Sequence, residues 1–148
     1  MLPYSYFHYI NLPKIPNEIL NQINFDFSSY DAKVISSGGN YRWSDSHNKI
    51  INDWCQQNIC SEMYWAFQII SGDMPIHKDN VTKTKFVYLL QTGGDNVVTE
   101  FYDEDKTNVL QSVIIEPHRW HILKVDTFHG VRNVDPGKIR FSITGRIF

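Results

Sequence analysis

The chain has few of the features that assign a sequence to a secreted, membrane or nucleic-acid-binding class. Its 148 residues include only two cysteines, Cys55 and Cys60, whereas a disulfide framework or a paired-cysteine zinc site needs more. We therefore expect two free thiols in a cytoplasmic protein. No apolar run approaches the ~18–20 residues of a membrane-spanning helix, and residues 1–10 lack the basic end and apolar stretch of a secretion signal. The sequence predicts no membrane partner.

A basic surplus is also missing. The chain carries 14 lysines and arginines against 16 acidic residues, which gives a formal net charge of −2. Proteins that neutralise nucleic-acid phosphates usually show a basic excess, so the charge balance argues against a nucleic-acid partner. With 42% hydrophobic and 20% charged residues and no repeat, linker or low-complexity segment, we expect one globular domain over residues 1–148. No pattern indicates an oligomeric state.

The composition changes near residue 60, which predicts a helical layer over residues 1–60 and a β-rich core over residues 61–148. Helical spacing of apolar residues covers 16–25 and 46–59. Segments rich in β-branched and aromatic residues predict strands at 63–70, 85–91, 97–102, 109–116, 120–125 and 139–148. An α+β, mostly β fold follows, in which two N-terminal helices pack on one sheet of a β-sandwich or jelly roll.

Two histidines and one aspartate predict a metal site. His77 and Asp79 are two residues apart, so in a strand both side chains point to the same side. Taken alone, this pair is more often a surface histidine and aspartate at a strand end. His129 follows about fifty residues later, and two imidazoles with one carboxylate can hold a metal while leaving other positions open for chemistry.

The last predicted strand has one apolar and one polar face. Alternation places Ile139, Phe141, Ile143 and Ile147 on the apolar face, and Arg140, Ser142, Thr144 and Arg146 on the polar face. Such a polar face often lies in water. An arginine and a hydroxyl two residues apart also form a carboxylate receptor, because a guanidinium binds a carboxylate through two charge-assisted hydrogen bonds. Taken jointly with the histidines and the aspartate, this pattern favours a metal site with an acid receptor beside it.

The motif His77-x-Asp79, a distal His129 and Arg140-x-Ser142 resembles that of the Fe(II)/2-oxoglutarate-dependent oxygenases, over about the last 85 residues. The resemblance implies a double-stranded β-helix of the jelly-roll and cupin type. It also implies that His77, Asp79 and His129 are the catalytic residues that hold Fe(II). Arg140, assisted by Ser142, would bind the C5 carboxylate of 2-oxoglutarate.

A second stretch is similar to the prolyl-hydroxylase branch of that family. The aromatic-containing segment 86–90 is followed by Gly93-Gly94 and by Thr99–Phe101, which resembles the branch's Gly-Gly-x-Thr-x-Phe stretch. Val97 and Val98 add residues before Thr99, so the match departs from the pattern in detail.

Three further residues are candidates for contact with the co-substrate. Tyr88 matches a tyrosine of the prolyl-hydroxylase branch that helps to bind the far carboxylate, although a core aromatic is an equal alternative. Arg146 follows Arg140 with the spacing of the branch that repairs alkylated nucleic acids, or it pairs with a surface acid. Gln68 lies on the strand before the His-x-Asp motif and could reach the co-substrate. His118 and His121 are three residues apart, so we expect them on opposite faces, in a turn or at the surface.

The resemblance implies a hydroxylase that decarboxylates 2-oxoglutarate to succinate and CO2 and uses O2, with ascorbate as a candidate further cofactor. It favours a peptidyl side chain as the hydroxylated substrate, with a small molecule as the other possibility. A non-catalytic cupin or jelly-roll module that binds a metal or a carbohydrate is an alternative, but such a module would not need Arg140. A nucleic-acid demethylase is a weaker alternative, because the basic surplus is missing.

Overall fold

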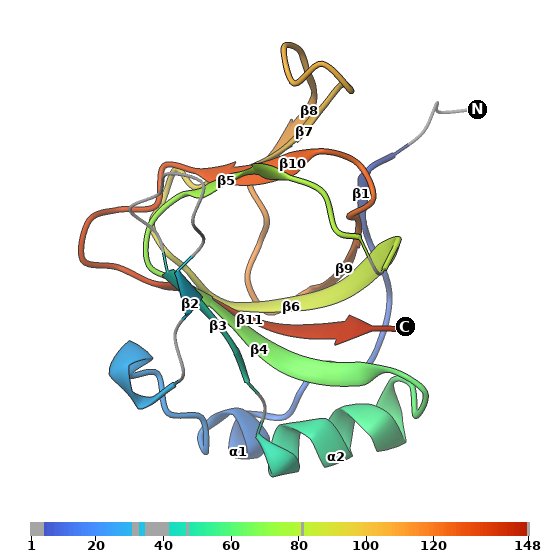
Figure 1. The fold of residues 1–148 in the computed structure, drawn as a ribbon. Helices are drawn as coiled ribbons and strands as arrows, with labels where there is room; N and C mark the ends of the chain where they lie inside the picture. The colour runs from blue at the N-terminus through green and yellow to red at the C-terminus, as the bar shows by residue number, and fades with distance from the viewer. Residues whose placement is uncertain (1–4, 31–32, 35–41, 47, 81, 148) are drawn as a thin grey trace.

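The computed structural model describes residues 5–30, 33–34, 42–46, 48–80 and 82–147. This part of the chain is mostly β, with two α-helices and antiparallel sheets, as predicted (Figure 1). The helices are α1 (Asn17–Leu20) and α2 (Lys49–Asn58), with a short 3-10 helix at Phe27–Ser29. The strands are β1 (Phe7–Tyr9), β2 (Lys33–Val34), β3 (Arg42–Ser46), β4 (Tyr64–Ile70), β5 (Met74–His77), β6 (Thr84–Thr92), β7 (Val98–Tyr102), β8 (Val109–Val113), β9 (Trp120–Lys124), β10 (His129–Arg132) and β11 (Arg140–Arg146). Within the described ranges, no helix has the length and apolar character needed to cross a membrane.

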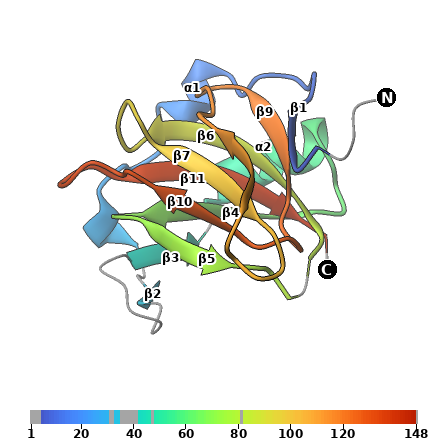
Figure 2. The same cartoon turned by 90° about the horizontal axis from the view of Figure 1, so that it is seen from above.

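The strands form two sheets that face each other (Figure 1 and Figure 2). The larger sheet has the strand order β1-β9-β6-β11-β4-β3-β2, and the smaller sheet has the order β5-β10-β7-β8. From β4 onward the chain passes repeatedly between them, because β4, β6, β9 and β11 lie in the larger sheet and β5, β7, β8 and β10 lie in the smaller one. Segments far apart in the sequence, such as β5 and β10, therefore become neighbours.

The first 60 residues differ from the predicted helical layer. They supply β1, β2 and β3, which lie at the two edges of the larger sheet. β1 and β2 have three and two residues, too few for alternation to reveal them, and β3 has five. The predicted helix 46–59 begins only at Lys49, because β3 pairs with β4 and the Asn48 side chain accepts hydrogen bonds from the N–H groups of Ile50 and Ile51. The predicted helix 16–25 is helical only over α1.

The six strands predicted after residue 60 all occur, with ends shifted by a few residues. Two further strands of four residues each, β5 and β10, complete the smaller sheet. The predicted last strand ran to Phe148, which lies outside the described residues, and β11 ends at Arg146.

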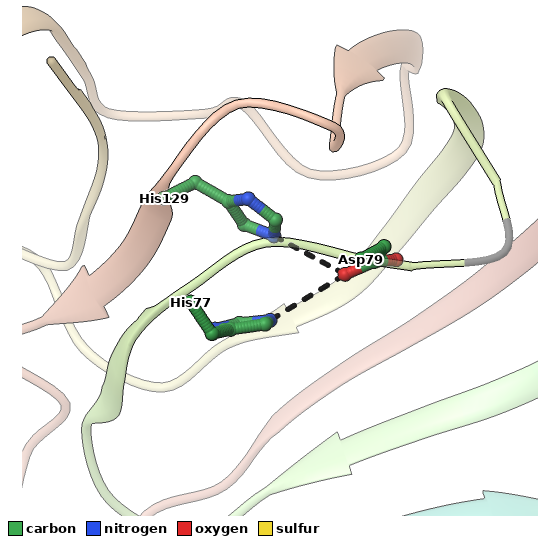
Figure 3. A group of neighbouring side chains, drawn as sticks. All are labelled: His77, Asp79 and His129. Carbon is green, nitrogen blue, oxygen red and sulfur yellow. Dashed lines mark ion pairs between the residues drawn. The ribbon is translucent and has the colours of Figure 1, made fainter. Parts of the chain in front are cut away.

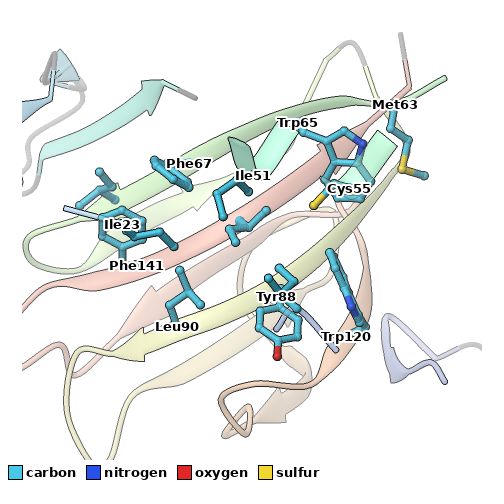
Figure 4. Close-up of a cluster of buried hydrophobic side chains, with 13 residues drawn as sticks. Ile23, Ile51, Cys55, Met63, Trp65, Phe67, Tyr88, Leu90, Trp120 and Phe141 are labelled. Carbon is cyan, nitrogen blue, oxygen red and sulfur yellow. The ribbon is translucent and has the colours of Figure 1, made fainter. Parts of the chain in front are cut away.

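The main apolar core lies between the larger sheet and the helices (Figure 4). Its largest members are Trp65, Phe67, Tyr88, Trp120 and Phe141, which pack with Ile51 and Cys55 of α2. Trp65 and Trp120 meet edge to face with ring centroids 5.6 Å apart. Their indole N–H groups donate to the carbonyls of Cys60 and Pro13, so both buried indole donors have hydrogen-bond acceptors. Both cysteines are free, and burial raises the pKa of Cys55 to about 12.

The central strand β11 separates this core from a second, more polar interior. Phe141 and Ile143 face the helix side and belong to the apolar core. Arg140, Ser142 and Thr144 alternate with them on the opposite face, and all three are buried. The polar face of β11 therefore does not lie in water. It lies between the two sheets, where buried polar groups need partners or a ligand.

Candidate metal centre

Three side chains from the smaller sheet and its connecting loop converge on one point (Figure 3). His77 ends β5, and His129 begins β10 directly opposite it in the sheet register. The Nε2 atoms of His77 and His129 lie 3.6 Å and 3.7 Å from Oδ1 of Asp79. All three candidate ligand atoms lie within 4.8 Å of one another.

These distances suit a metal ion placed between the three atoms. For a metal–ligand bond of about 2.1 Å, two ligands at a right angle lie about 3.0 Å apart. The two separations from Oδ1 of Asp79 exceed this by less than one ångström, and all three atoms lie within 4.8 Å of one another, so an inward shift of the side chains completes the coordination. Two imidazoles and one carboxylate on one side form the donor set typical of non-haem Fe(II).

Backbone carbonyls orient both imidazoles toward that point. Nδ1 of His77 lies 2.8 Å from the carbonyl oxygen of Pro75, and Nδ1 of His129 lies 2.7 Å from that of Thr127. A carbonyl oxygen can only accept, so each Nδ1 carries a proton and each Nε2 is the ring nitrogen left to bind a metal. Such contacts fix the tautomer and ring orientation of metal-binding histidines.

Local backbone features bring the three residues together. The sequence predicts His77 and Asp79 in one strand, but β5 ends at His77 and Asp79 lies in the loop that follows. The N–H of Asp79 donates to the carbonyl of Val125 at 2.8 Å. The register between β10 and β5 shifts directly after His129. A Cβ on Gly130 would lie only 2.9 Å from the carbonyl oxygen of Met74. Glycine therefore permits the close approach of β10 to β5 that places the two imidazoles side by side, with ring centroids 4.4 Å apart.

The electrostatic surroundings keep the cluster ready for a cation. Burial raises the pKa of Asp79, but a hydrogen bond with His77 and the nearby charge of Lys85 outweigh it and lower the pKa to about 2. Burial, together with the proximity of His77, lowers the pKa of His129 to about 4. At neutral pH the cluster thus presents an ionised carboxylate and, at His129, a neutral imidazole, which are the forms that bind metals.

A cavity of about 40 Å³ lies between the sheets next to His129. Its polar lining consists of Gln68, Lys85, Thr99, His121, Arg140 and Ser142, in addition to His129. The remaining lining is apolar and comes from both sheets. The cavity therefore connects one candidate metal ligand, His129, with the polar face of β11.

Arg140 is the buried cation of that face. Its guanidinium donates to the carbonyl of Thr92 at 2.9 Å and to the hydroxyl of Thr99 at 3.4 Å. Burial lowers its pKa to about 10, so it remains charged at neutral pH. Ser142 and Gln68 face each other across β11 and β4 and line the same cavity. The structure thus brings the predicted acid receptor close to the predicted metal ligands.

Two predicted residues lie elsewhere. Tyr88 is the clear correction: it pairs with Ile143 in the β6–β11 register and packs against Trp120 at 4.9 Å, on the helix side of the larger sheet. Its phenol is separated from the cavity by the sheet. Arg146 pairs in register with Lys85 and with Tyr64, and its guanidinium lies 5.9 Å from the Tyr64 ring centroid. It does not line the cavity.

Three cavity residues were not predicted as part of the site. Lys85 and His121 face the cavity from β6 and β9, and Thr99 faces it from β7. His121 was expected in a turn or at the surface, yet it is 1% exposed, and burial lowers its pKa to about 4. Its Nδ1 donates to the carbonyl of Arg119. In the sequence, alternation puts His121 on the same strand face as the apolar Leu123, which indicates burial. Both faces of β6 and β9 are apolar, however, so alternation does not show which face points toward the cavity.

No protein-family model and no curated protein sequence matches the chain, but solved structures share its arrangement of strands. HppE with Fe(II) and substrate has a TM-score of 0.51 and 7% identity, over 86% of this chain and 62% of that chain. The chain has the cupin-like fold of HppE. It spans about three fifths of that enzyme's length, and at this identity the likeness concerns the fold alone.

Two further matches are weaker. Hydroxypropylphosphonic acid epoxidase from S. wedmorenis in complex with fosfomycin has a TM-score of 0.49 and 7% identity, over 86% of this chain and 60% of that chain. An oxidoreductase of the 2OG-Fe(II) oxygenase family from Burkholderia pseudomallei has a TM-score of 0.48 and 10% identity, over 80% of this chain and 73% of that chain.

Proposed function

We propose that the protein is an Fe(II)- and 2-oxoglutarate-dependent dioxygenase built on a double-stranded β-helix. His77, Asp79 and His129 hold the iron, and Arg140 with Ser142 holds the C5 carboxylate of the co-substrate. The observation that carries this proposal is one cavity lined both by His129 of the His–Asp–His cluster and by the buried Arg140. The fold shared with HppE, whose solved structure contains Fe(II), supports the choice of metal.

The charges favour a doubly negative co-substrate. Lys85 and Arg140 supply two positive charges and Asp79 one negative charge, which leaves +1 in this buried region. Fe(II) raises the sum to +3, and a dianion returns it to +1. Because uncompensated buried charge is costly, a dicarboxylate suits the loaded site better than a neutral ligand does.

The residues of the chain hold and orient the acid. Thr92 and Thr99 each accept one hydrogen bond from the guanidinium of Arg140, which leaves other N–H groups to form a bidentate pair with a carboxylate. The hydroxyl of Ser142 and the amide of Gln68 line the same wall. When bound, iron and 2-oxoglutarate would supply the oxidising chemistry, in which O2 hydroxylates a C–H bond and the keto acid leaves as succinate and CO2. Ascorbate is a candidate auxiliary reductant.

The cavity must widen to admit this acid. A volume of about 40 Å³ holds roughly three water molecules, whereas 2-oxoglutarate is larger. Long side chains in the lining, Gln68 and Met74 among them, can change rotamer without moving the strands. We therefore expect co-substrate binding to shift these side chains while both sheets stay in place.

The substrate approaches from the side of His77. Its side chain is 34% exposed, whereas that of His129 is 7% exposed. The C–H bond to be hydroxylated can belong to a peptidyl side chain or to a small molecule. The prolyl-hydroxylase resemblance loses one of its residues because Tyr88 faces the other side of the sheet. Arg146 lies outside the cavity lining, which weakens the nucleic-acid demethylase alternative.

An anaerobic titration tests the proposal. Purified metal-free protein is loaded with Fe(II) and then with 2-oxoglutarate, while the weak visible absorption band of an Fe(II)–keto acid chelate is followed. We expect the band to appear in the wild-type protein and to be absent in the His129→Ala variant. Admission of O2 should then yield succinate. A wild-type protein that binds Fe(II) but gives no band would refute the assignment of 2-oxoglutarate.

The small cavity also favours a second candidate, a cupin-like module that binds a metal without catalysis. Such a module would bind divalent metal through the same three ligands but would take up no keto acid. The titration separates the two functions. Buried Arg140 argues for the enzyme, because a buried cation without an anionic ligand only lowers stability.

A further inference from the structure

Lys85 places a buried cation beside the metal ligands. It lies at the start of β6, its side chain is 7% exposed, and it faces the cavity together with Val87 and Leu89. Its Nζ lies 3.5 Å from Oδ2 of Asp79. A lysine is almost never this deeply buried without a specific charged partner, and here one such partner is the candidate metal ligand Asp79.

The two oxygens of Asp79 have different surroundings. Oδ1 faces the Nε2 atoms of both His77 and His129, at 3.6 Å and 3.7 Å. Oδ2 faces Lys85. The N–H of Asp79 donates to the carbonyl of Val125, so Asp79 is held both at its backbone and at Oδ2. Only Oδ1 points to the position that a metal would occupy.

From this division we infer that Lys85 is a positioning residue that makes Asp79 a one-oxygen ligand. The inference rests on the proposed function, because it concerns how the same cluster would hold its metal. A carboxylate that is not held can turn and offer both oxygens. With two imidazoles it would then fill four of six octahedral positions, and a chelating keto acid together with O2 needs three. Lys85 thus keeps the third position open.

Two other roles for Lys85 predict different results. A structural lysine that merely keeps Asp79 ionised and in place would support metal binding, so its loss would lower the affinity for the metal. A lysine that competes with the metal for Asp79 would be displaced when the metal binds, so its loss would raise the affinity for the metal and leave the affinity for the co-substrate unchanged. The positioning role predicts that loss of Lys85 raises the affinity for the metal, since a nearby positive charge is removed, and lowers the affinity for the co-substrate.

The test uses the metal-free 148-residue chain as wild type, Lys85→Met, Lys85→Gln and Lys49→Met. Methionine matches the length of the lysine stem without its charge, and glutamine keeps a donor for Oδ2. Lys49→Met is the matched control, because it removes an exposed Lys–Asp pair of α2 at 2.6 Å. Each protein is titrated with Co(II) alone, and the absorption spectrum of bound Co(II) is recorded as a measure of coordination. The Co(II)-loaded proteins are then titrated with 2-oxoglutarate.

We expect Lys85→Met to bind Co(II) at least about tenfold more tightly, with a changed absorption spectrum. It should bind 2-oxoglutarate at least about tenfold more weakly. Lys85→Gln should also bind Co(II) more tightly, but it should lose less affinity for 2-oxoglutarate than Lys85→Met does, because it lacks the charge and keeps a donor for Oδ2. Lys49→Met should match the wild type in both.

Weaker Co(II) binding by Lys85→Met, or an unchanged affinity for 2-oxoglutarate, overturns the inference. If the methionine variant does not fold, Lys85→Gln decides, since weaker Co(II) binding there has the same meaning. A wild-type protein that binds Co(II) but not 2-oxoglutarate contradicts the proposed co-substrate instead. In that case the Co(II) affinities and spectra of the variants still decide the role of Lys85.

Discussion

Replacing Arg140 with methionine should remove the proposed acid receptor and leave the metal ligands in place. Arg140 is 5% exposed and is held by Thr92 and Thr99. Burial lowers its pKa from 12.5 to about 10, which corresponds to about 3 kcal/mol by which its charged form is disfavoured. An acid that pairs with the guanidinium offsets part of this cost.

The expected loss follows from the burial of the pair. Truncating one partner of a buried, hydrogen-bonded charge pair costs about 2–5 kcal/mol, so 2-oxoglutarate should bind about 30- to 3,000-fold more weakly. The affinity for Fe(II) should stay within a factor of about three, because the ligands are untouched. The free energy of unfolding should change little or rise, since an apolar side chain of similar length replaces a buried charge.

The assay is anaerobic calorimetric titration of the metal-loaded proteins with two keto acids. 2-Oxopentanoate carries a methyl group where 2-oxoglutarate carries its C5 carboxylate, so the ratio of the two affinities isolates that contact. The wild type should prefer 2-oxoglutarate strongly, and Arg140→Met should lose most of this preference. An Arg140→Met protein that keeps the full preference would refute the reasoning.

Three further predictions follow from the site and its surroundings. His129→Ala should weaken Co(II) binding at least about 100-fold, because mutating a residue that merely hydrogen-bonds to a metal ligand already lowers metal affinity by about 10–100-fold. Titration against a competing chelator measures the affinity, and an unchanged value would exclude His129 as a ligand. Gly145→Ala should lower the free energy of unfolding in urea by about 1–3 kcal/mol, because its Cβ would lie 2.5 Å from the Trp65 ring, with unchanged Co(II) affinity as the control. His121 has a folded-state pKa of about 4 against 6.5, so its contribution to stability is present above pH 6.5 and is lost as the pH falls toward 4, by up to about 3 kcal/mol. His121→Gln should therefore show a smaller loss of stability between pH 7 and pH 4.5 than the wild type, and an equal loss would contradict the buried neutral imidazole.

The sequence predicts the two faces of β11 because they differ completely in polarity. Phe141 and Ile143 alternate with Arg140 and Ser142, so the phase of the strand is unambiguous. It does not predict that both faces are buried, since that depends on the smaller sheet lying over the polar side.

β6 shows the opposite case. Phe86, Tyr88 and Leu90 face the helices, while Lys85 and Val87 face the cavity. Both faces of this strand are apolar over most of its length, so alternation cannot tell which side is inward. Tyr88 is a candidate only through the family resemblance, and the pattern of the strand shows neither that Tyr88 faces away from the cavity nor that Lys85 faces it.

The metal cluster depends on contacts between distant segments. The spacing of His77 and Asp79 is visible in the sequence, although a loop held by Val125 rather than a continuous strand positions the aspartate. The approach of His129 requires the pairing of β10 with β5, which no local pattern encodes. Only the combined motif, in which Arg140 follows at a set spacing in the sequence, indicates that these residues meet.

A crystal structure of the protein grown with Mn(II), an air-stable substitute for Fe(II), and 2-oxoglutarate tests the central claim most directly. We expect the anomalous signal of the metal at bonding distance from Nε2 of His77, Nε2 of His129 and Oδ1 of Asp79, with the C5 carboxylate of the acid on Arg140. A metal bound elsewhere, or an acid found outside the cavity between the sheets, would contradict the account.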